Sequence, residues 1–270
     1  MENHKLKTIL NSTVYASLCV QIATGFIDLY VYFLPAAGEL AILKKMLKLE
    51  IFVQIVEGTF YTWLATGSSH IKNITPHRYY DWAITTPIML FTFCLYLDYL
   101  GEHDKKTKEP LMPLETGHQN TSLNNAGTKE SPQEIYPKMG YHRRIKQVKD
   151  MNLWQYLLQK KKYLLPIFVL NWIMLMFGYL GEIGYLDNKV AVICGFLPFI
   201  VYFAIIYDKF SKYSSMVGRI IFWIFFAIWA LYGVAALATY YWKNIAYNIL
   251  DLFAKNFFGI VLAYTLYMHL

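Results

Sequence analysis

Charged side chains are scarce in this chain of 270 residues, since Asp, Glu, Lys and Arg together make up 16% of it. Hydrophobic residues account for 56% and aromatic residues for 18%, and the mean hydropathy is +0.31. This composition excludes an intrinsically disordered chain and a nucleic-acid-binding domain. The formal net charge is +7, so the positions of the basic residues must show whether they mark an acidic partner or the cytoplasmic loops of a membrane protein.

Cysteine is also scarce, and its positions exclude two kinds of site. Cys19, Cys94 and Cys194 lie far apart, each inside an apolar stretch. Such spacing supports neither a disulfide framework nor a metal centre, so we expect no metal site. The first apolar run lacks a small-residue cleavage site at its end, and we therefore expect no cleaved signal peptide.

Seven apolar runs reach the length of about 20 residues that a helix needs to cross the hydrocarbon core. They lie at 12–35, 50–69, 78–100, 163–186, 190–207, 217–241 and 245–269. The sequence therefore predicts an all-α membrane protein, a single domain over residues 1–270 that forms a bundle of seven transmembrane helices. Residues 101–152 are rich in Gly, Asn, Thr, Lys and Pro and lack periodicity, which predicts a long, mobile loop.

Basic residues are concentrated in the connections after the first, third and fifth runs. They include Lys44, Lys45, Lys48, Arg143, Arg144, Lys209, Lys212 and Arg219. Lysine and arginine close to the ends of spans stay in the cytoplasm, so these connections should be cytoplasmic. We expect an integral, multi-pass protein surrounded by lipid, with its N-terminus outside and its C-terminus in the cytoplasm.

Several ionisable residues fall inside the apolar runs, where each charge costs about 2.5 to 3.5 kcal/mol. Lys255 lies about eleven residues into the last run, too deep for its ammonium group to reach either surface easily. Asp251 stands four residues earlier on the same face, so a simple intrahelical ion pair is one interpretation. Asp81 and Thr85 share a face of the third run, and the other interpretation is a buried cation that needs a carboxylate from a second helix.

Three motifs follow one another along the chain: R-Y-x-D-W-x-x-T-T-P at 78–87, W-x-x-Y at 229–232 and D-x-x-x-K at 251–255. Together with the seven runs they resemble the microbial, or type 1, rhodopsins over nearly the whole chain except 101–152. Seven-helix receptors of the G-protein class fit poorly, because neither E/D-R-Y nor N-P-x-x-Y occurs in the sequence.

The resemblance implies that Lys255 forms a protonated Schiff base with all-trans retinal, with Asp81 and Asp251 as its counterions. This agrees with the need of a buried cation for a nearby carboxylate. The implied retinal pocket consists of Tyr79, Trp82, Thr86, Met89, Met174, Gly195, Trp229 and Tyr232, residues that also suit an ordinary bundle core. Val192, Gly233 and Ala236 depart from the proton-pump pattern, so the absorption maximum does not follow from the sequence. Asn171 is expected to bond to Thr86 as a neutral pair.

Two features disfavour an outward proton pump. Thr92 stands where the pumps of this family have a carboxylic proton donor, and a threonine has no proton to give near pH 7. The outer glutamates of the release group are also missing from the connection between the last two runs, where Trp242, Lys243 and Asn244 stand.

A row of polar residues instead favours an ion path. Glu50, Gln54 and Glu57 share one face of the second run, and Glu57 falls where algal channelrhodopsins have a gating glutamate. With Ser17, Arg78 and Asn248 they are the residues that we expect along a cation path. Two alternatives stay open here, because Glu50 also suits an interfacial charge and Glu57 a hydrogen-bonded core carboxyl group.

The combination of Ser17, Glu50, Glu57, Asp81 and Asn248 looks like the first subgroup of rhodopsins encoded by giant viruses of algae. This resemblance implies a light-gated cation channel in the host cell membrane, and not an enzyme. The transported ions would be monovalent cations or protons, and the chain could form homo-oligomers. In this hypothesis light isomerises retinal, the Schiff base proton passes to Asp81, and a hydrated path opens near Glu57 and Asn248. A weak outward proton pump and a photosensor remain alternatives.

Overall fold

The computed structural model describes residues 2–36, 38, 40–67, 71–108 and 152–268, and in these residues every regular element is helical. The α-helices are α1 (Glu2–Phe33), α2 (Leu40–Gly67), α3 (Thr75–Lys108), α5 (Leu153–Glu182), α6 (Asn188–Lys209), α7 (Met216–Ala236), α8 (Tyr240–Asp251) and α9 (Phe257–Met268), and a short 3-10 helix, Ser211–Tyr213, lies between α6 and α7. A π-helical turn over Leu252–Asn256 joins α8 to α9 without a break. The predicted all-α bundle of seven membrane-spanning helices is therefore confirmed, with α8, the turn and α9 as the seventh.

Six of these helical segments are long and apolar enough to cross a membrane, judged by their length and composition. The remaining helix is α2, whose apolar sequence is interrupted by Glu50, Gln54 and Glu57. All three side chains are buried. These three polar side chains of α2 therefore face the interior of the bundle, where intramembrane ionisable groups are usually found.

The helices extend beyond the apolar runs at their lysine-rich ends. α2 begins at Leu40 rather than at 50, and α5 begins at Leu153 rather than at 163. α3 continues to Lys108, so residues 101–108, predicted as loop, are helical, while 109–151 lie outside the described residues. Lysine and glutamate are good helix formers but polar, so a helix continues through them although the apolar run has ended. The lengths of the apolar runs therefore underestimate the lengths of the helices.

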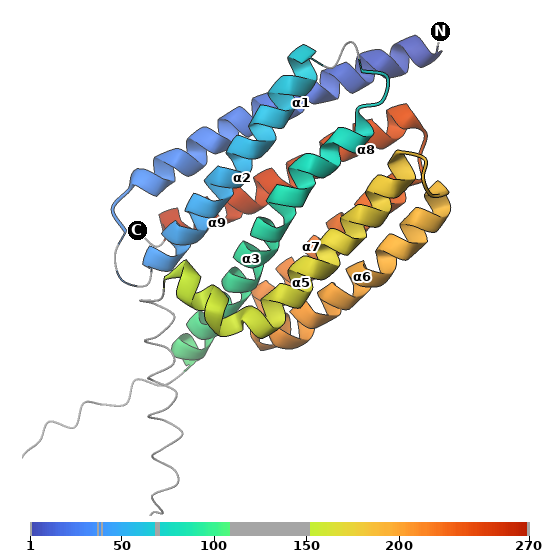
Figure 1. Ribbon diagram of the computed structural model, residues 1–270. Helices are drawn as coiled ribbons and strands as arrows, with labels where there is room; N and C mark the ends of the chain where they lie inside the picture. Colours follow the sequence, from blue (N-terminus) through green and yellow to red (C-terminus); the bar gives the residue numbers. More distant parts are fainter. Residues whose placement is uncertain (1, 37, 39, 68–70, 109–151, 269–270) are drawn as a thin grey trace, which may run out of the picture.

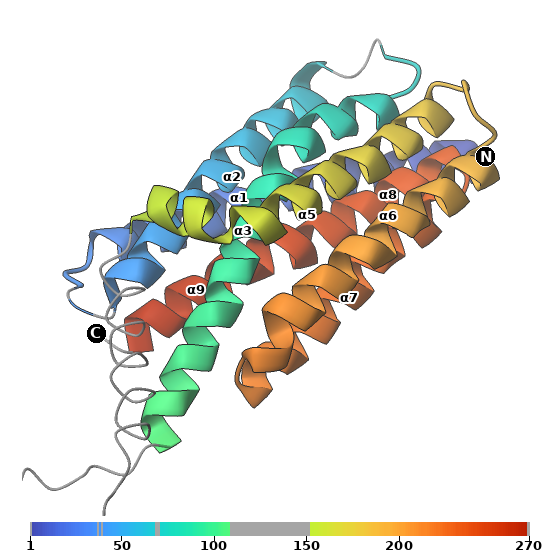
Figure 2. The ribbon, with the colours of Figure 1, turned by 60° about the horizontal axis from the view of Figure 1, so that its bottom comes forward.

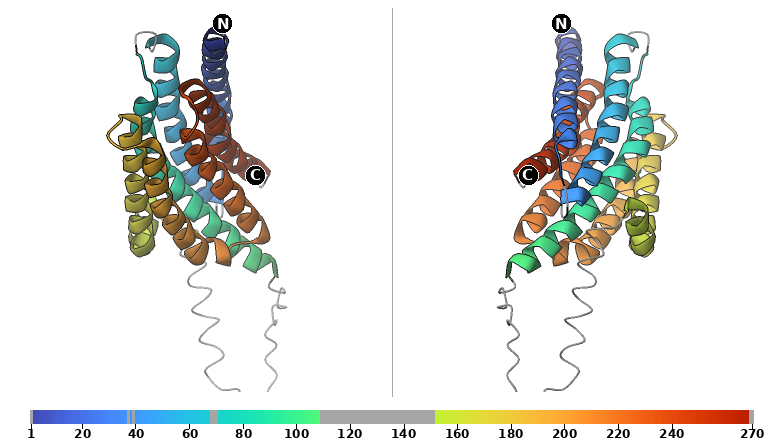
Figure 3. Two further views of the ribbon diagram at one scale, coloured as in Figure 1. Left: turned by 90° about the vertical axis from the view of Figure 1, so that its right-hand side faces the viewer. Right: turned by 90° about the vertical axis from the view of Figure 1, so that its left-hand side faces the viewer.

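The bundle has two sides that meet at α3 and the seventh helix (Figures 1 and 2). α1 and α2 pack together on one side and contact α8 and α9, whereas α5, α6 and α7 form the other side. Figure 3 shows the N-terminus at the end of the bundle that also has the α2–α3, α5–α6 and α7–α8 connections. We call this the outer end, because the positive-inside pattern predicts it to lie outside the cell, and the opposite end the inner end.

Aromatic rings fill the inner half of the bundle between α3, α7 and α9. Phe93 stacks on Phe225 with ring centroids 4.4 Å apart, and Phe258 packs edge-on against both rings. Phe222 extends the cluster toward the inner end. This packing makes the centre of the α3–α7 contact apolar, whereas the buried carboxylates of the inner half lie on the opposite side, between α1, α2 and the seventh helix.

Candidate functional site

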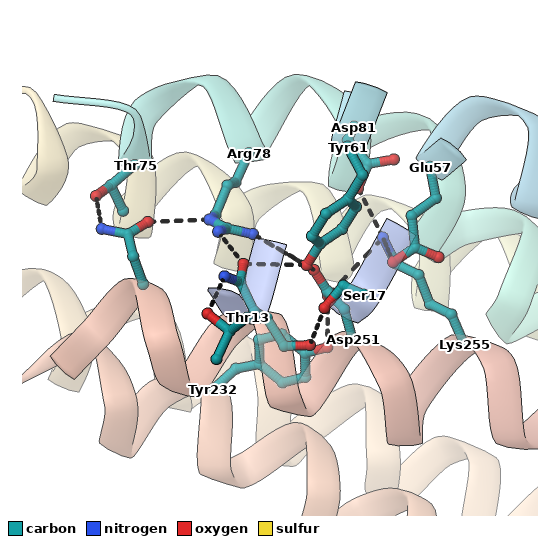
Figure 4. A network of polar contacts seen from close by, with 12 residues as sticks. Thr13, Ser17, Glu57, Tyr61, Thr75, Arg78, Asp81, Tyr232, Asp251 and Lys255 are labelled. Atoms are coloured by element: carbon teal, nitrogen blue, oxygen red, sulfur yellow. Dashed lines mark hydrogen bonds and ion pairs between the residues drawn. The ribbon is translucent and has the colours of Figure 1, made fainter. Parts of the chain in front are cut away.

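Lys255 lies at the centre of the bundle on the π-helical turn, with only 2% of its side chain exposed. Its Nζ is 2.6 Å from Oδ2 of Asp81, 3.4 Å from Oε1 of Glu57 and 3.9 Å from Oδ1 of Asp251 (Figure 4). Three helices thus place carboxylates around one ammonium group. Asp251, the partner in the simple intrahelical interpretation, is the most distant of the three, and Asp81 is the direct hydrogen-bond partner.

Asp251 is held by donors from three other helices. Tyr61 of α2 donates to Oδ2 over 2.7 Å, Tyr232 of α7 donates to Oδ1 over 2.7 Å, and Arg78 of α3 lies 3.5 Å from Oδ2. Sequence reasoning did not single out Tyr61. The available signal was its position four residues after Glu57, which puts both side chains on one face of α2.

Glu57 is the carboxylate of this cluster that has the fewest contacts. Lys255 and Arg78 are the cations that pair with the three carboxylates, so the acidic groups outnumber the basic ones. Neither oxygen of Glu57 has a hydrogen-bond partner among the described residues, although the side chain is fully buried. The polar contact of Glu57 in this cluster is thus the ion pair of its Oε1 with Nζ of Lys255 at 3.4 Å.

Arg78 is the centre of a hydrogen-bond network in the outer half (Figure 4). The guanidinium is fully buried, and it donates to Oδ1 of Asn244 over 3.0 Å, to Oδ1 of Asn248, and to the hydroxyl of Tyr61 over 3.4 Å. Arginine suits this position, because its five fixed N–H donors serve several acceptors at once. The guanidinium thereby connects α3 with α2 and α8.

Asparagine amides extend this network to α1 and to the start of α3. Asn248 donates to the hydroxyl of Thr13 over 2.8 Å, and its backbone carbonyl accepts a bond of 3.2 Å from Ser17. Asn244 donates to Thr75 over 2.9 Å. Ser17 and Asn248, both predicted in the ion path, are thus brought together with Arg78, whereas Thr13, Thr75 and Asn244 were missed because their meeting depends on how separate helices are rotated.

A pocket with about 780 Å³ of empty space opens beside Lys255, between α3, α5, α6, α7 and the seventh helix. Its lining includes all eight residues predicted for the retinal pocket: Tyr79, Trp82, Thr86, Met89, Met174, Gly195, Trp229 and Tyr232. The small residues Val192, Gly233 and Ala236 line it as well. Space is tight at Gly233, where an added Cβ would lie 2.5 Å from the ring of Phe196.

The residues of this pocket fit retinal. Its walls are mainly aromatic and aliphatic, as an apolar polyene requires, and the buried amine of Lys255 is part of the lining, where an aldehyde could condense with it. Trp82 and Trp229 both line the pocket, and the buried Nε1 of Trp229 has no hydrogen-bond partner among the described residues. The expected pair in the wall is confirmed, since Nδ2 of Asn171 donates to Oγ1 of Thr86 over 2.7 Å.

Glu50 and Gln54 lie on the inner side of Glu57 along α2. Glu50 has no exposed surface, so it is not an interfacial charge, and that alternative is wrong. Gln54 is also buried. Thr92 faces the same region from α3, and its hydroxyl donates to the carbonyl of Ile88 over 2.9 Å. The structure therefore places both predicted α2 residues inside the bundle and leaves Thr92 as a satisfied hydroxyl.

Comparisons with known proteins agree with this architecture. A family model described as "Bacteriorhodopsin-like protein" matches residues 12–118 and 151–268. The viral rhodopsin OLPVRII superposes with a TM-score of 0.69 at 25% sequence identity, over 97% of this chain and 99% of that one. No curated protein sequence matches the chain.

More distant solved structures share the fold. Acetabularia rhodopsin I has a TM-score of 0.63 at 15% identity, covering 97% of this chain and 95% of its own. Halorhodopsin, a light-driven chloride pump, has a TM-score of 0.61 at 12% identity, covering 94% of this chain and 93% of its own. At these identities the likeness shows the fold alone.

Proposed function

Because the chain belongs to the bacteriorhodopsin-like family of microbial rhodopsins, we propose that it is a light-gated cation channel in which Lys255 binds retinal. Members of this family bind retinal as their chromophore and are integral membrane proteins. The observation that supports a channel is the row of buried polar side chains between α1, α2 and the seventh helix. From the outer to the inner end these are Asn248, Ser17, Glu57, Gln54 and Glu50.

Lys255 would hold retinal, which would supply the absorption of light and an isomerisation next to the nitrogen of Lys255. Asp81 is the proton acceptor in this proposal, because its Oδ2 is 2.6 Å from that nitrogen. Once the proton has moved, the positive charge that holds Glu57 and Asp251 near Lys255 is gone. Glu57 has no other partner among the described residues, so it is the group that is released first.

Release of Glu57 opens the path on the α1–α2 side of the bundle. The carboxylate turns toward Gln54 and Glu50, and water enters between the three side chains, since buried polar groups without partners favour hydration. Arg78 and Asn248 form the outer closure, which opens when Asp251 no longer fixes Tyr61 and Arg78. Carboxylates along the path then attract cations and repel anions.

A voltage-clamp experiment tests this function directly. Cells that express the chain with added all-trans retinal are illuminated at stepped voltages, and external Na⁺ is then replaced by N-methyl-D-glucamine. We expect a photocurrent that reverses and a reversal potential that becomes more negative when Na⁺ is removed. An outward current that never reverses would identify a pump, and silence from a coloured protein at the cell surface would identify a sensor.

Glu57→Gln tests the gate within the same assay. The amide keeps the shape of the side chain and removes its charge, so we expect changed current size and closing rate. Glu182→Gln is the control, because Glu182 pairs with Lys243 at 2.6 Å and does not contact Lys255. Unchanged photocurrent amplitude, selectivity and kinetics in Glu57→Gln would exclude Glu57 as the gate.

A weak outward proton pump is the second candidate, and Asp81 is the observation that favours it. Its position beside Lys255 provides the acceptor that a pump needs. Thr92 disfavours it, because a hydroxyl that already donates to Ile88 supplies no proton. The predicted assembly into homo-oligomers and the predicted location in a host cell membrane remain proposals.

A further inference from the structure

Buried polar side chains without partners are concentrated in the inner half of the bundle, on the α1–α2 side. We call them the inner polar cluster: Gln21, Asp28, Glu50, Gln54 and Asn256. Among the described residues, both carboxylate oxygens of Asp28 and Glu50 lack a hydrogen-bond partner, as do both amide atoms of Gln21 and Gln54 and the Nδ2 of Asn256. None of the five is more than 6% exposed.

Contacts between α1 and the seventh helix fix the position of this cluster. Thr24 donates to Oδ1 of Asn256 over 2.6 Å, and Asn256 directly follows Lys255. One turn further along α1, the carboxylate of Asp28 lies against Gly259 of α9, where an added Cβ would be 2.6 Å from Oδ2. Glycine at 259 therefore makes room for the carboxylate of Asp28.

Residues of α2 and α3 complete the cluster. A Cβ added to Gly58 would lie 3.8 Å from Oε1 of Gln21, so Gln21 faces α2 beside Glu57. Glu50 on α2 has Thr92 of α3 and Asp28 of α1 as neighbours. The cluster thus extends from the level of Glu57 to the level of Asp28 near the inner end of α1.

The inner polar cluster differs from the outer network in one respect. Arg78 connects the outer acceptors, whereas no ion pair among the described residues includes Asp28 or Glu50. An unsatisfied buried polar group destabilises the folded protein, and a buried carboxylate without a cation destabilises it more. Carboxylate and amide oxygens without partners, as in Asp28, Glu50 and Gln54, are the ligands that a hard cation prefers.

We propose that Asp28 and Glu50, with the amide oxygen of Gln54, form a cation site that holds one alkali-metal ion on the inner side of Glu57. The proposal rests on the proposed channel function, because the ion reaches this site along the path. Two carboxylates attract one monovalent ion strongly enough to remove part of its hydration shell. They leave the site with a net negative charge, so the next ion is attracted in turn.

Infrared spectroscopy tests the site without measuring current. The full-length protein with retinal is reconstituted in vesicles on an infrared crystal, and Na⁺ is exchanged for N-methyl-D-glucamine in darkness and under continuous light. We expect carboxylate bands that change with Na⁺ and that weaken in both Asp28→Asn and Glu50→Gln. Asp208→Asn is the control, because Asp208 is a half-exposed carboxylate that pairs with Lys209 and Lys212.

Currents from inside-out patches provide the second measurement. Asp28→Asn should raise the cytoplasmic Na⁺ concentration for half-maximal outward photocurrent about tenfold, and it should leave the value for external Na⁺ and inward current within twofold. Glu50→Gln is the second variant, which keeps the test valid if Asp28→Asn does not fold.

These results separate the site from the channel. Na⁺-dependent carboxylate bands without a reversing current would support the site and reject the channel. A reversing current with unchanged bands and unchanged half-saturation in both variants would reject the site and support the channel. Protonated carboxyl bands that do not respond to Na⁺ would also reject it, because Asp28 and Glu50 would then hold a proton instead of a cation.

Discussion

The distances around Lys255 predict the order in which three substitutions shift the colour of the protein. With retinal bound to Lys255, excitation would move positive charge away from the nitrogen, so a negative group beside the nitrogen would stabilise the ground state more than the excited state. Removing that group should shift absorption to longer wavelength. The effect should decrease with distance, from Asp81 at 2.6 Å to Glu57 at 3.4 Å and Asp251 at 3.9 Å.

Coulomb's law gives the relative size of these effects. At an effective dielectric constant of about 20, a unit charge at these three distances interacts with the nitrogen by about 6, 5 and 4 kcal/mol. Only part of each energy is lost on excitation, but the ratios are set by geometry. We therefore expect the largest red shift for Asp81→Asn, a smaller one for Glu57→Gln and the smallest for Asp251→Asn.

Absorption spectra of the three purified variants with retinal, recorded at one pH, make the measurement. Glu50→Gln is a matched control, because Glu50 is equally buried but makes no ion pair with Lys255 among the described residues. Its absorption maximum should stay close to that of the unmodified protein. A largest shift in Asp251→Asn, or a shift to shorter wavelength in Asp81→Asn, would refute the assignment of Asp81 as the nearest counterion.

Three further changes have expected outcomes. Lys255→Ala should abolish visible absorption and the increase in protein mass on adding retinal, whereas retention of both would show that retinal binds elsewhere. Tyr61→Phe should lower the free energy of unfolding by about 1.5 to 3 kcal/mol, because it removes a hydrogen bond to the carboxylate of Asp251; an unchanged denaturation curve in detergent would contradict this. Gly233→Ala should slow pigment formation, since its Cβ would lie 2.5 Å from the Phe196 ring. Gly25→Ala is the control, with nothing within 4 Å, and equal rates in the two variants would show that the pocket tolerates the methyl group.

The sequence predicted the parts of the site that follow from position along one helix. Lys255 was identifiable because a lysine in the middle of an apolar run needs a partner, and Asp81 because the motif around it places a carboxylate in the third span. The eight pocket residues came from a family resemblance, and the structure brings them together around one pocket.

Relations between helices could not be predicted in the same way. Glu57 lies nearer to Lys255 than Asp251 does. This order depends on the rotation of α2 about its axis and on the π-helical turn. Asp28 was overlooked, although the sequence contained a signal for it. An aspartate within the first apolar run is as unusual as one in the third. Thr13 gave no such signal, since a threonine in a membrane helix usually bonds to its own backbone.

The π-helical turn under Lys255 has a consequence for the phase of the seventh helix. A π turn holds one residue more than an α-turn, and each residue of a helix turns the chain by about 100°. The wider turn therefore changes which neighbouring helices the residues of α9 face, while the residues of α8 face the same neighbours as before. If the turn tightened by one residue, Gly259 would rotate away from Asp28 while Asn244 and Asn248 stayed bound to Arg78. A change in the π-helical turn would thus rotate α9 relative to α8, and the turn contains Lys255, the residue where light would act.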